Sequence, residues 1–114
     1  MELEATGRQK DILDHILTLL RQGVAQTLGE QFEALVLYGS QARQQATARS
    51  DIDVLIIVKS PFEYSDLVRQ TSQLVASLSL EYDRVISRAF VSKERFEQEQ
   101  SPFLCNVRRE GVFI

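Results

Sequence analysis

Apolar residues recur at helical spacing over the first part of the chain, at Ile12, Leu13, Ile16, Leu19, Leu20 and Val24. An apolar residue at every third or fourth position forms one face of an α-helix. The spacing therefore predicts an amphipathic helix from about Thr6 to Leu28, and Gly29 is well placed to end it.

Two short apolar runs of strand length follow this helix. The first, Ala34 to Tyr38, stops at Gly39, and the second spans residues 51–58. Beyond Asp53 the second run is apolar at every position, which is typical of a strand buried on both faces in the middle of a sheet. Residues 40–46, between the two runs, could make one or two helical turns.

The second half of the chain predicts three helices and a third strand. A helix is expected from Ser60 and Pro61 to about residue 79, because proline is favoured in a first helical turn. Alternation over residues 81–91 predicts a strand, and residues 93–98 predict a short charged helix. Ser101 as N-cap and Pro102 start a last helix, Gly111 ends it, and a short strand at 112–114 is an option. This order of elements predicts one small α/β domain over residues 1–114.

Composition narrows the class of protein. With 44% apolar and 25% charged residues the chain has the composition of a soluble globular domain, and a net charge of -3 offers no electrostatic footprint for long nucleic acid. The single cysteine, Cys105, excludes an internal disulfide and fits a reducing compartment. No signal peptide is apparent, and the longest strongly apolar run, Val54 to Val58, is too short to span a membrane. We therefore expect a cytoplasmic protein with no membrane partner.

Two aspartates stand at the mouth of the predicted central strand. Side chains two residues apart on a strand point to the same face, so Asp51 and Asp53 should share a face while Ile52 points away. Two neighbouring carboxylates repel each other, and one of them would take up a proton unless a cation is bound. Their hard oxygen atoms suit Mg²⁺ or Mn²⁺, and Mg²⁺ is commonly held by one or two carboxylates together with substrate phosphates.

A glycine turn precedes the acid pair. Gly39 allows the backbone to approach a ligand closely, and the following amides and the Ser40 hydroxyl can donate hydrogen bonds to an anion. Arg43 could reach the same anion. Taken singly, a Gly-Ser turn is usually only a turn, and Arg43 could equally pair with a surface acid. Taken together, the turn and the acid pair predict a site for a nucleoside triphosphate and a metal ion.

These residues resemble a known signature. The pattern resembles the motif of the polymerase-β-type nucleotidyltransferase superfamily, in its minimal nucleotidyltransferase branch. It consists of Gly39-Ser40, ten further residues, and then Asp51-Ile52-Asp53 followed by an apolar strand. The resemblance implies a small mixed β-sheet flanked by helices. This chain departs from the family pattern at the turn, because it has Gln44 where many relatives carry glycine.

The resemblance also implies a third carboxylate on a neighbouring strand. Asp83 is the best match and Glu81 the alternative, although relatives often have an apolar residue where Arg84 stands. The catalytic set would be Asp51, Asp53 and Asp83, which would hold two Mg²⁺ ions. ATP would be the donor, with its phosphates at the Gly-Ser turn.

Minimal nucleotidyltransferases are commonly paired with a small helical HEPN toxin. The resemblance therefore implies an antitoxin that moves AMP from ATP to a tyrosine of that partner. The alternative is a non-catalytic nucleotide-sensing subunit that neutralises a helical partner by binding. A small-molecule acceptor such as an aminoglycoside is less favoured, since such enzymes generally carry an additional helical domain. The acceptor, the base preference and any homo-oligomer stay open.

Overall fold

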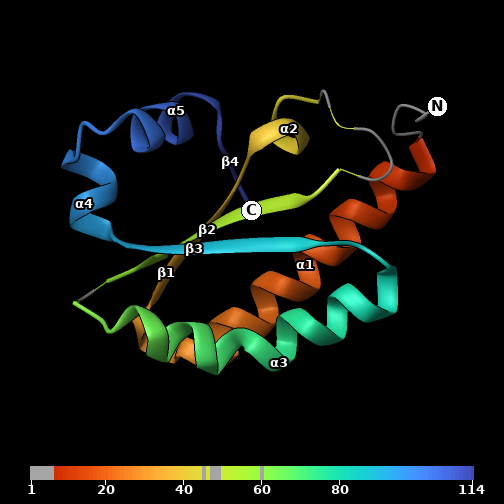
Figure 1. Cartoon of the computed structure of the whole chain (residues 1–114), viewed down its shortest axis with the longest axis horizontal. Helices are drawn as coiled ribbons and strands as arrows, with labels where there is room; N and C mark the ends of the chain where they lie inside the picture. The colour runs from red at the N-terminus through yellow and green to blue at the C-terminus, as the bar shows by residue number, and fades with distance from the viewer. Residues whose placement is uncertain (1–6, 45, 47–49, 60) are drawn as a thin grey trace.

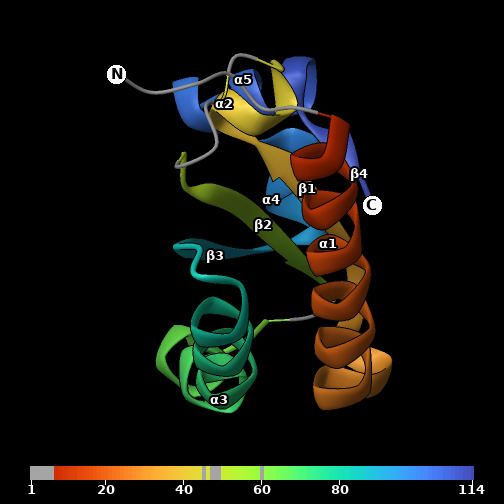
Figure 2. The same cartoon turned by 90° about the vertical axis from the view of Figure 1, so that its right-hand side faces the viewer.

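A four-stranded sheet organises the chain, as seen in a computed structural model that describes residues 7–44, 46, 50–59 and 61–114. Helices α1 (Gly7–Leu28) and α3 (Tyr64–Tyr82) cover one face, and α4 (Lys93–Gln98) and α5 (Pro102–Glu110) cover the other (Figure 1). The short helix α2 (Gly39–Ala42) lies at one end of the sheet beside α5 (Figure 2). This is the α/β arrangement that the hydrophobic pattern predicts.

The sheet is mixed. Its strands are β1 (Phe32–Tyr38), β2 (Ile52–Val58), β3 (Ile86–Ser92) and β4 (Val112–Phe113), in the spatial order β3-β2-β1-β4. β1 pairs antiparallel with β2 and β4, whereas β2 and β3 are parallel. A parallel pair needs a crossover connection, which α3 provides. The predicted central position of the second strand is confirmed, because β2 lies between β1 and β3.

Two hydrophobic clusters lie on opposite faces of the sheet. The larger one joins α1 and α3 to the sheet and includes Ile16, Leu20, Val54, Ile56 and Leu67. The smaller one joins α4 and α5 to the sheet and includes Val36, Leu55, Ile57, Leu104 and Val107. β2 contributes to both clusters with alternate residues, which explains why its sequence is almost entirely apolar.

Several predicted boundaries are confirmed. α1 ends at Leu28, and Gly29, with φ of +58°, begins a short 3-10 turn, Gly29–Gln31. The charged helix spans Lys93–Gln98, as predicted. The Ser101 hydroxyl caps α5 by accepting a hydrogen bond from the Leu104 amide, and Pro102 occupies the first turn. The predicted start of the first helix, Thr6, and the predicted start of the next one, Ser60, lie outside the described residues.

Two predictions around α3 are wrong. Pro61 precedes the helix, which begins only at Tyr64, because the Glu63 carbonyl accepts the first helical hydrogen bonds. The helix then runs on to Tyr82, where a strand was predicted from Glu81. Asp83 ends it in the left-handed conformation (φ 52°), and β3 starts only at Ile86. Across the described residues, no helix has the length and apolar character needed to cross a membrane.

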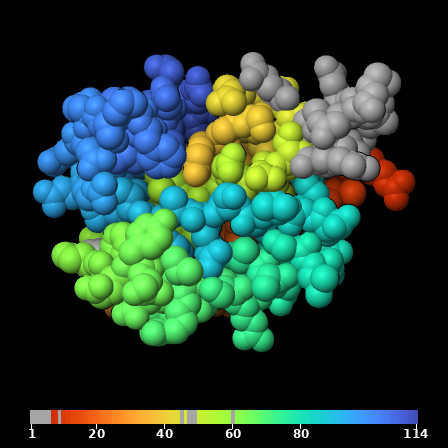
Figure 3. Space-filling model, viewed as in Figure 1, coloured from red at the N-terminus to blue at the C-terminus, as the bar shows by residue number. Residues whose placement is uncertain are grey.

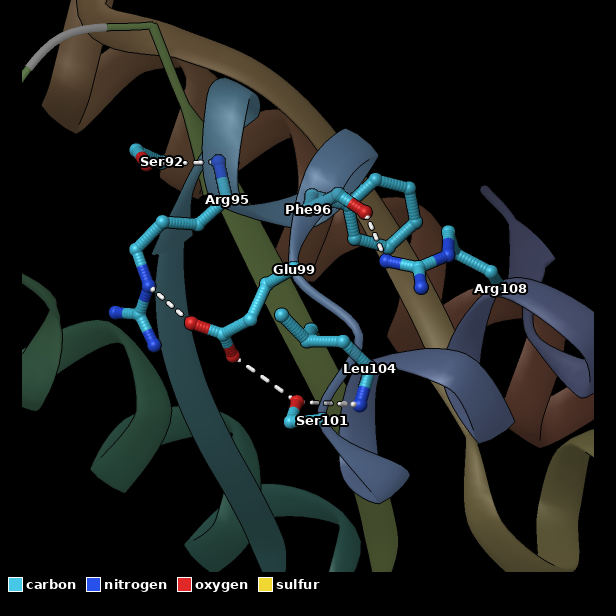
Figure 4. A network of polar contacts seen from close by, with 7 residues as sticks. All are labelled: Ser92, Arg95, Phe96, Glu99, Ser101, Leu104 and Arg108. Atoms are coloured by element: carbon cyan, nitrogen blue, oxygen red, sulfur yellow. Dashed lines mark hydrogen bonds and ion pairs between the residues drawn. The ribbon is translucent and has the colours of Figure 1, made fainter.

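A chain of polar contacts fixes the turn between α4 and α5 (Figure 4). Glu99 accepts hydrogen bonds from the Arg95 guanidinium and from the Ser101 hydroxyl, both at 3.0 Å, and these bonds lower the pKa of its carboxyl. The Arg108 guanidinium donates to the Phe96 carbonyl at 2.6 Å. These contacts attach α5 firmly to α4 and hold it beside the end of β1.

Candidate functional site

The glycine turn brings the backbone against the second aspartate. Tyr38, the last residue of β1, pairs with Asp53 of β2, and Gly39 then turns into α2 with φ of +76°. A Cβ atom at Gly39 would lie 2.5 Å from Oδ2 of Asp53. Both the backbone angle and this close approach therefore require glycine. Ser40 follows, half-buried, in the first turn of α2.

The acid pair lies on the face of the sheet opposite the larger core. Ile52 is fully buried in that core, so the residues on either side of it point to the other face. Asp51 is exposed and Asp53 is half-buried. Partial burial raises the pKa of the Asp53 carboxyl, the charge of Asp51 raises it further, and Arg43 opposes both. The charge of Asp51 thus disfavours the ionised form of Asp53, as expected for two acids that lie close together.

Arg43 lies between the acid pair and α5. Its guanidinium contacts the Glu110 carboxylate at 3.4 Å, and its charge also acts on Asp53. The next residue, Gln44, adopts φ of +58°, a conformation that glycine takes up without strain. This angle gives a physical reason for the glycine that relatives often carry at the position of Gln44.

A pocket of about 160 Å³ opens beside the turn. It lies between the end of β1, α2 and α5, and the C-terminal helices and α2 adjoin on the surface in Figure 3. Its lining consists of Tyr38, Gly39, Arg43, Phe103, Asn106, Val107 and Glu110. The rings of Tyr38 and Phe103 meet edge to face with 5.3 Å between centroids. A cavity of about 150 Å³ holds a benzene ring, so this pocket has room for a small aromatic group.

The predicted third carboxylate does not join the acid pair. Asp83 is an exposed residue that ends α3, and Glu81 lies within the last turn of that helix. In the register of β3, Ser87 is the residue opposite Asp53. No group of three or more histidine, cysteine, aspartate or glutamate side chains in the described ranges is arranged to hold a metal ion. The structure thus brings together Asp51, Asp53, the Gly-Ser turn and Arg43, but neither Asp83 nor Glu81.

Sequence reasoning missed two residues that position the acid pair. The carbonyl of Ser50, directly before Asp51, accepts hydrogen bonds from the Gln41 amide at 3.1 Å and from the Arg84 guanidinium at 3.0 Å. Gln41 is buried within α2, and it therefore ties the Gly-Ser turn to the start of β2. The sequence feature that could have identified Gln41 is its position directly after Gly39 and Ser40. The signal for Arg84 was its departure from the apolar residue of many relatives.

The arrangement is that of a nucleotidyltransferase domain. Residues 23–114 match the family model described as Polymerase beta, Nucleotidyltransferase. The chain therefore belongs to the polymerase beta nucleotidyltransferase family.

A curated relative agrees with this assignment, and several solved structures share the fold. A Methanocaldococcus jannaschii protein provisionally named protein adenylyltransferase is 34% identical over 82 residues, which are 71% of this chain and 76% of that protein. The toxin-antitoxin with AMP-PNP is 20% identical, with a TM-score of 0.54, over 88% of this chain and 69% of that one. A provisionally assigned nucleotidyltransferase from Sulfolobus solfataricus is 16% identical, with a TM-score of 0.54, over 89% and 83%.

A mutant of the toxin-antitoxin pair MntA-HpeT, in which a tyrosine is replaced by alanine, is also similar. It is 22% identical, with a TM-score of 0.51, over 89% of this chain and 69% of that one. At these identities the solved structures establish the fold that the chain shares with them.

Proposed function

We propose that the chain transfers AMP from ATP to a tyrosine hydroxyl of a small helical HEPN-type toxin, and so acts as its antitoxin. The observation that carries the proposal is the contact between the glycine turn and the acid pair, in which Gly39 lies directly against Asp53. Family membership supports the reaction class, and the name of the archaeal relative supports a protein as acceptor.

The donor set fits one divalent cation. Two carboxylates on one strand face suit Mg²⁺ or Mn²⁺ that is also bound to phosphates, and a cation there would relieve the repulsion that raises the pKa of Asp53. When bound, the cation would neutralise charge on the triphosphate. Asp51 and Asp53 would hold it. With no third carboxylate at the pair among the described residues, we place no second ion.

The remaining residues bind and orient the substrate. The backbone at Gly39 and Ser40 would hold the phosphates, with Arg43 beside them. The bond from the acceptor oxygen to the α-phosphorus forms while the bond to pyrophosphate breaks, so the work of the protein is to position groups and to balance charge. We place the base of ATP in the pocket that shares Gly39 and Arg43 with the turn, because Tyr38 and Phe103 offer it aromatic surface.

The solved neighbours support the choice of partner. Two of them are toxin-antitoxin pairs, one crystallised with AMP-PNP and one with a tyrosine replaced by alanine. Another mutant in this group has glutamate in place of two aspartates that lie two residues apart, the spacing of Asp51 and Asp53 in this chain. These descriptions belong to those proteins, and they make a toxin with an acceptor tyrosine the first partner to test.

A transfer assay tests the proposal. The chain is incubated with Mg²⁺, ATP labelled at the α-phosphate, and the product of the adjacent gene, chosen if it is a short helical protein with an Arg-x4-6-His motif. We expect label on that protein, and a loss of roughly 100-fold or more in Asp51→Asn and Asp53→Asn. Asp66→Asn is the matched control, because Asp66 is a half-buried aspartate of α3 that pairs with Arg69, away from the acid pair. Near-normal transfer by Asp53→Asn in a folded protein would refute the site.

The absence of a third carboxylate at the acid pair, within the described residues, favours one second candidate. The chain could neutralise a helical partner by binding alone and use the site to sense a nucleotide. In the same assay, tight binding of the partner without transfer of label supports this candidate. Label on the partner excludes it.

A further inference from the structure

The acid pair has an unexpected neighbour on the next strand. The Ile52 amide donates to the Val85 carbonyl at 2.9 Å, so the segments around Asp51 and Arg84 run side by side. The guanidinium of Arg84 then reaches the Ser50 carbonyl at 3.0 Å. A cationic side chain thus lies beside Asp51, at the end of the sheet where the family resemblance predicts an acid.

Arg84 is not fully satisfied by its surroundings. Its Nε atom is buried and has no hydrogen-bond partner among the described residues. An unpaired buried donor costs stability, so each one in a native protein calls for an explanation, such as strain, a catalytic role or a bound group. The charge of Asp51 favours the protonated form of Arg84 and partly offsets the lowering of its pKa by burial.

A second arginine, Arg88, has a structural role and serves as a comparison for Arg84. Arg88, in β3, packs against α3 and donates to the Thr71 hydroxyl at 2.8 Å, the Val68 carbonyl at 2.9 Å and the Ser72 hydroxyl at 3.0 Å. These bonds attach β3 to α3, on the face of the sheet away from the acid pair. Arg84 makes fewer contacts of this kind, and its guanidinium donates to the Ser50 carbonyl, directly before Asp51.

We propose that Arg84 replaces the third carboxylate, so that this site binds one divalent cation per nucleotide and the guanidinium supplies the further positive charge to the phosphates. The inference rests on the proposed function. A guanidinium beside Asp51 repels a second cation, and its remaining N–H groups can donate to phosphate oxygens. Arg84 would therefore bind substrate at the place where relatives of the family use an acid to bind metal.

Binding measurements test this without relying on turnover. Mn²⁺ is titrated into the chain, with and without a non-hydrolysable ATP analogue, and followed by electron paramagnetic resonance. We expect one Mn²⁺ per chain at saturation. Arg84→Gln should weaken binding of the analogue by about 10- to 100-fold, since a hydrogen bond to a charged group is lost. The same variant should bind Mn²⁺ more tightly without nucleotide, because a repelling charge is gone.

Controls separate the possible outcomes. Arg88→Gln should lower stability without changing either affinity, and Arg84→Lys should retain part of the affinity for the analogue because it keeps the charge. Two Mn²⁺ ions per chain, or unchanged binding of the analogue by folded Arg84→Gln, would overturn the inference. If Asp53→Asn also leaves Mn²⁺ binding intact, the proposed function itself fails. If that variant loses Mn²⁺ while Arg84→Gln changes nothing, only the role of Arg84 fails.

Discussion

The two faces of the sheet differ in what they bury. The face under α1 and α3 carries the larger cluster, and Ile52, Val54 and Ile56 of β2 all point into it. On the face under α4 and α5 the same strand presents Leu55 and Ile57 to a smaller cluster, which stops before the end that carries Asp53. One strand therefore divides its residues between a face that is packed along its length and a face whose packing stops near Asp53, and substitutions should separate the two.

A matched pair of leucine substitutions tests this difference. Leu20 is fully buried in the larger cluster, and Leu104 is almost as buried on a nine-residue helix of the smaller one. Leu20→Ala should lower the free energy of unfolding by about 3–5 kcal/mol, and Leu104→Ala by about 2–3 kcal/mol because a peripheral helix can collapse onto the cavity. Urea denaturation measures both. A larger loss of unfolding free energy for Leu104→Ala than for Leu20→Ala would contradict the view that the face under α1 and α3 carries the main core.

Two glycines in the left-handed region sharpen the comparison. Gly39 and Gly29 have φ values of +76° and +58°, but a Cβ would meet Asp53 only at Gly39 and open space at Gly29. Each change to alanine should cost about 1–2 kcal/mol of unfolding free energy through backbone strain. Only Gly39→Ala should also displace the Asp53 carboxylate, so binding of Mn²⁺ should be lost in that variant alone. Equal binding by both variants would show that the close approach at Gly39 is not needed.

The smallest of the expected changes is in the pH dependence of the free energy of unfolding. Burial and the charge of Asp51 raise the pKa of Asp53 in the folded protein above its ordinary value of 3.8. Between these two values the folded protein binds more protons than the unfolded chain, so stability falls as pH rises through that window. Without metal, Asp53→Asn should remove this slope and be slightly more stable than the parent at pH 7. Urea denaturation between pH 4 and 7 measures it, and Asp66→Asn should keep the slope.

Local rules predicted most of the fold. The cap at Ser101, the proline at 102 and the glycines at 29 and 111 each act within a few residues, and the elements they bound are confirmed. The orientation of the acid pair, which depends only on neighbours along the chain, also follows the sequence pattern. The two aspartates share a face because Ile52 is buried on the other.

The failures lie where distant contacts decide. Alternation over residues 81–91 favours a strand, but Leu80 to Tyr82 continue the helix until Asp83 turns into the left-handed region. That turn removes Asp83 from the strand and puts Arg84 next to Ser50, 34 residues away in the sequence. A pattern of apolar residues carries no information on such a contact, so the place of Arg84 beside Ser50 was not predictable from the sequence.

The attachment of α5 to α4 has a consequence for how the pocket can vary. The contacts of Arg95, Glu99 and Ser101 tie this helix to α4, its neighbour in the chain, and Arg108 reinforces the tie through the Phe96 carbonyl. Helix α5, which forms the outer wall of the pocket, is thus held in place by contacts within its own part of the chain. Substitutions on that wall can therefore change which group the pocket accepts, while Asp53 of β2 and Asp51 directly before the strand stay in place.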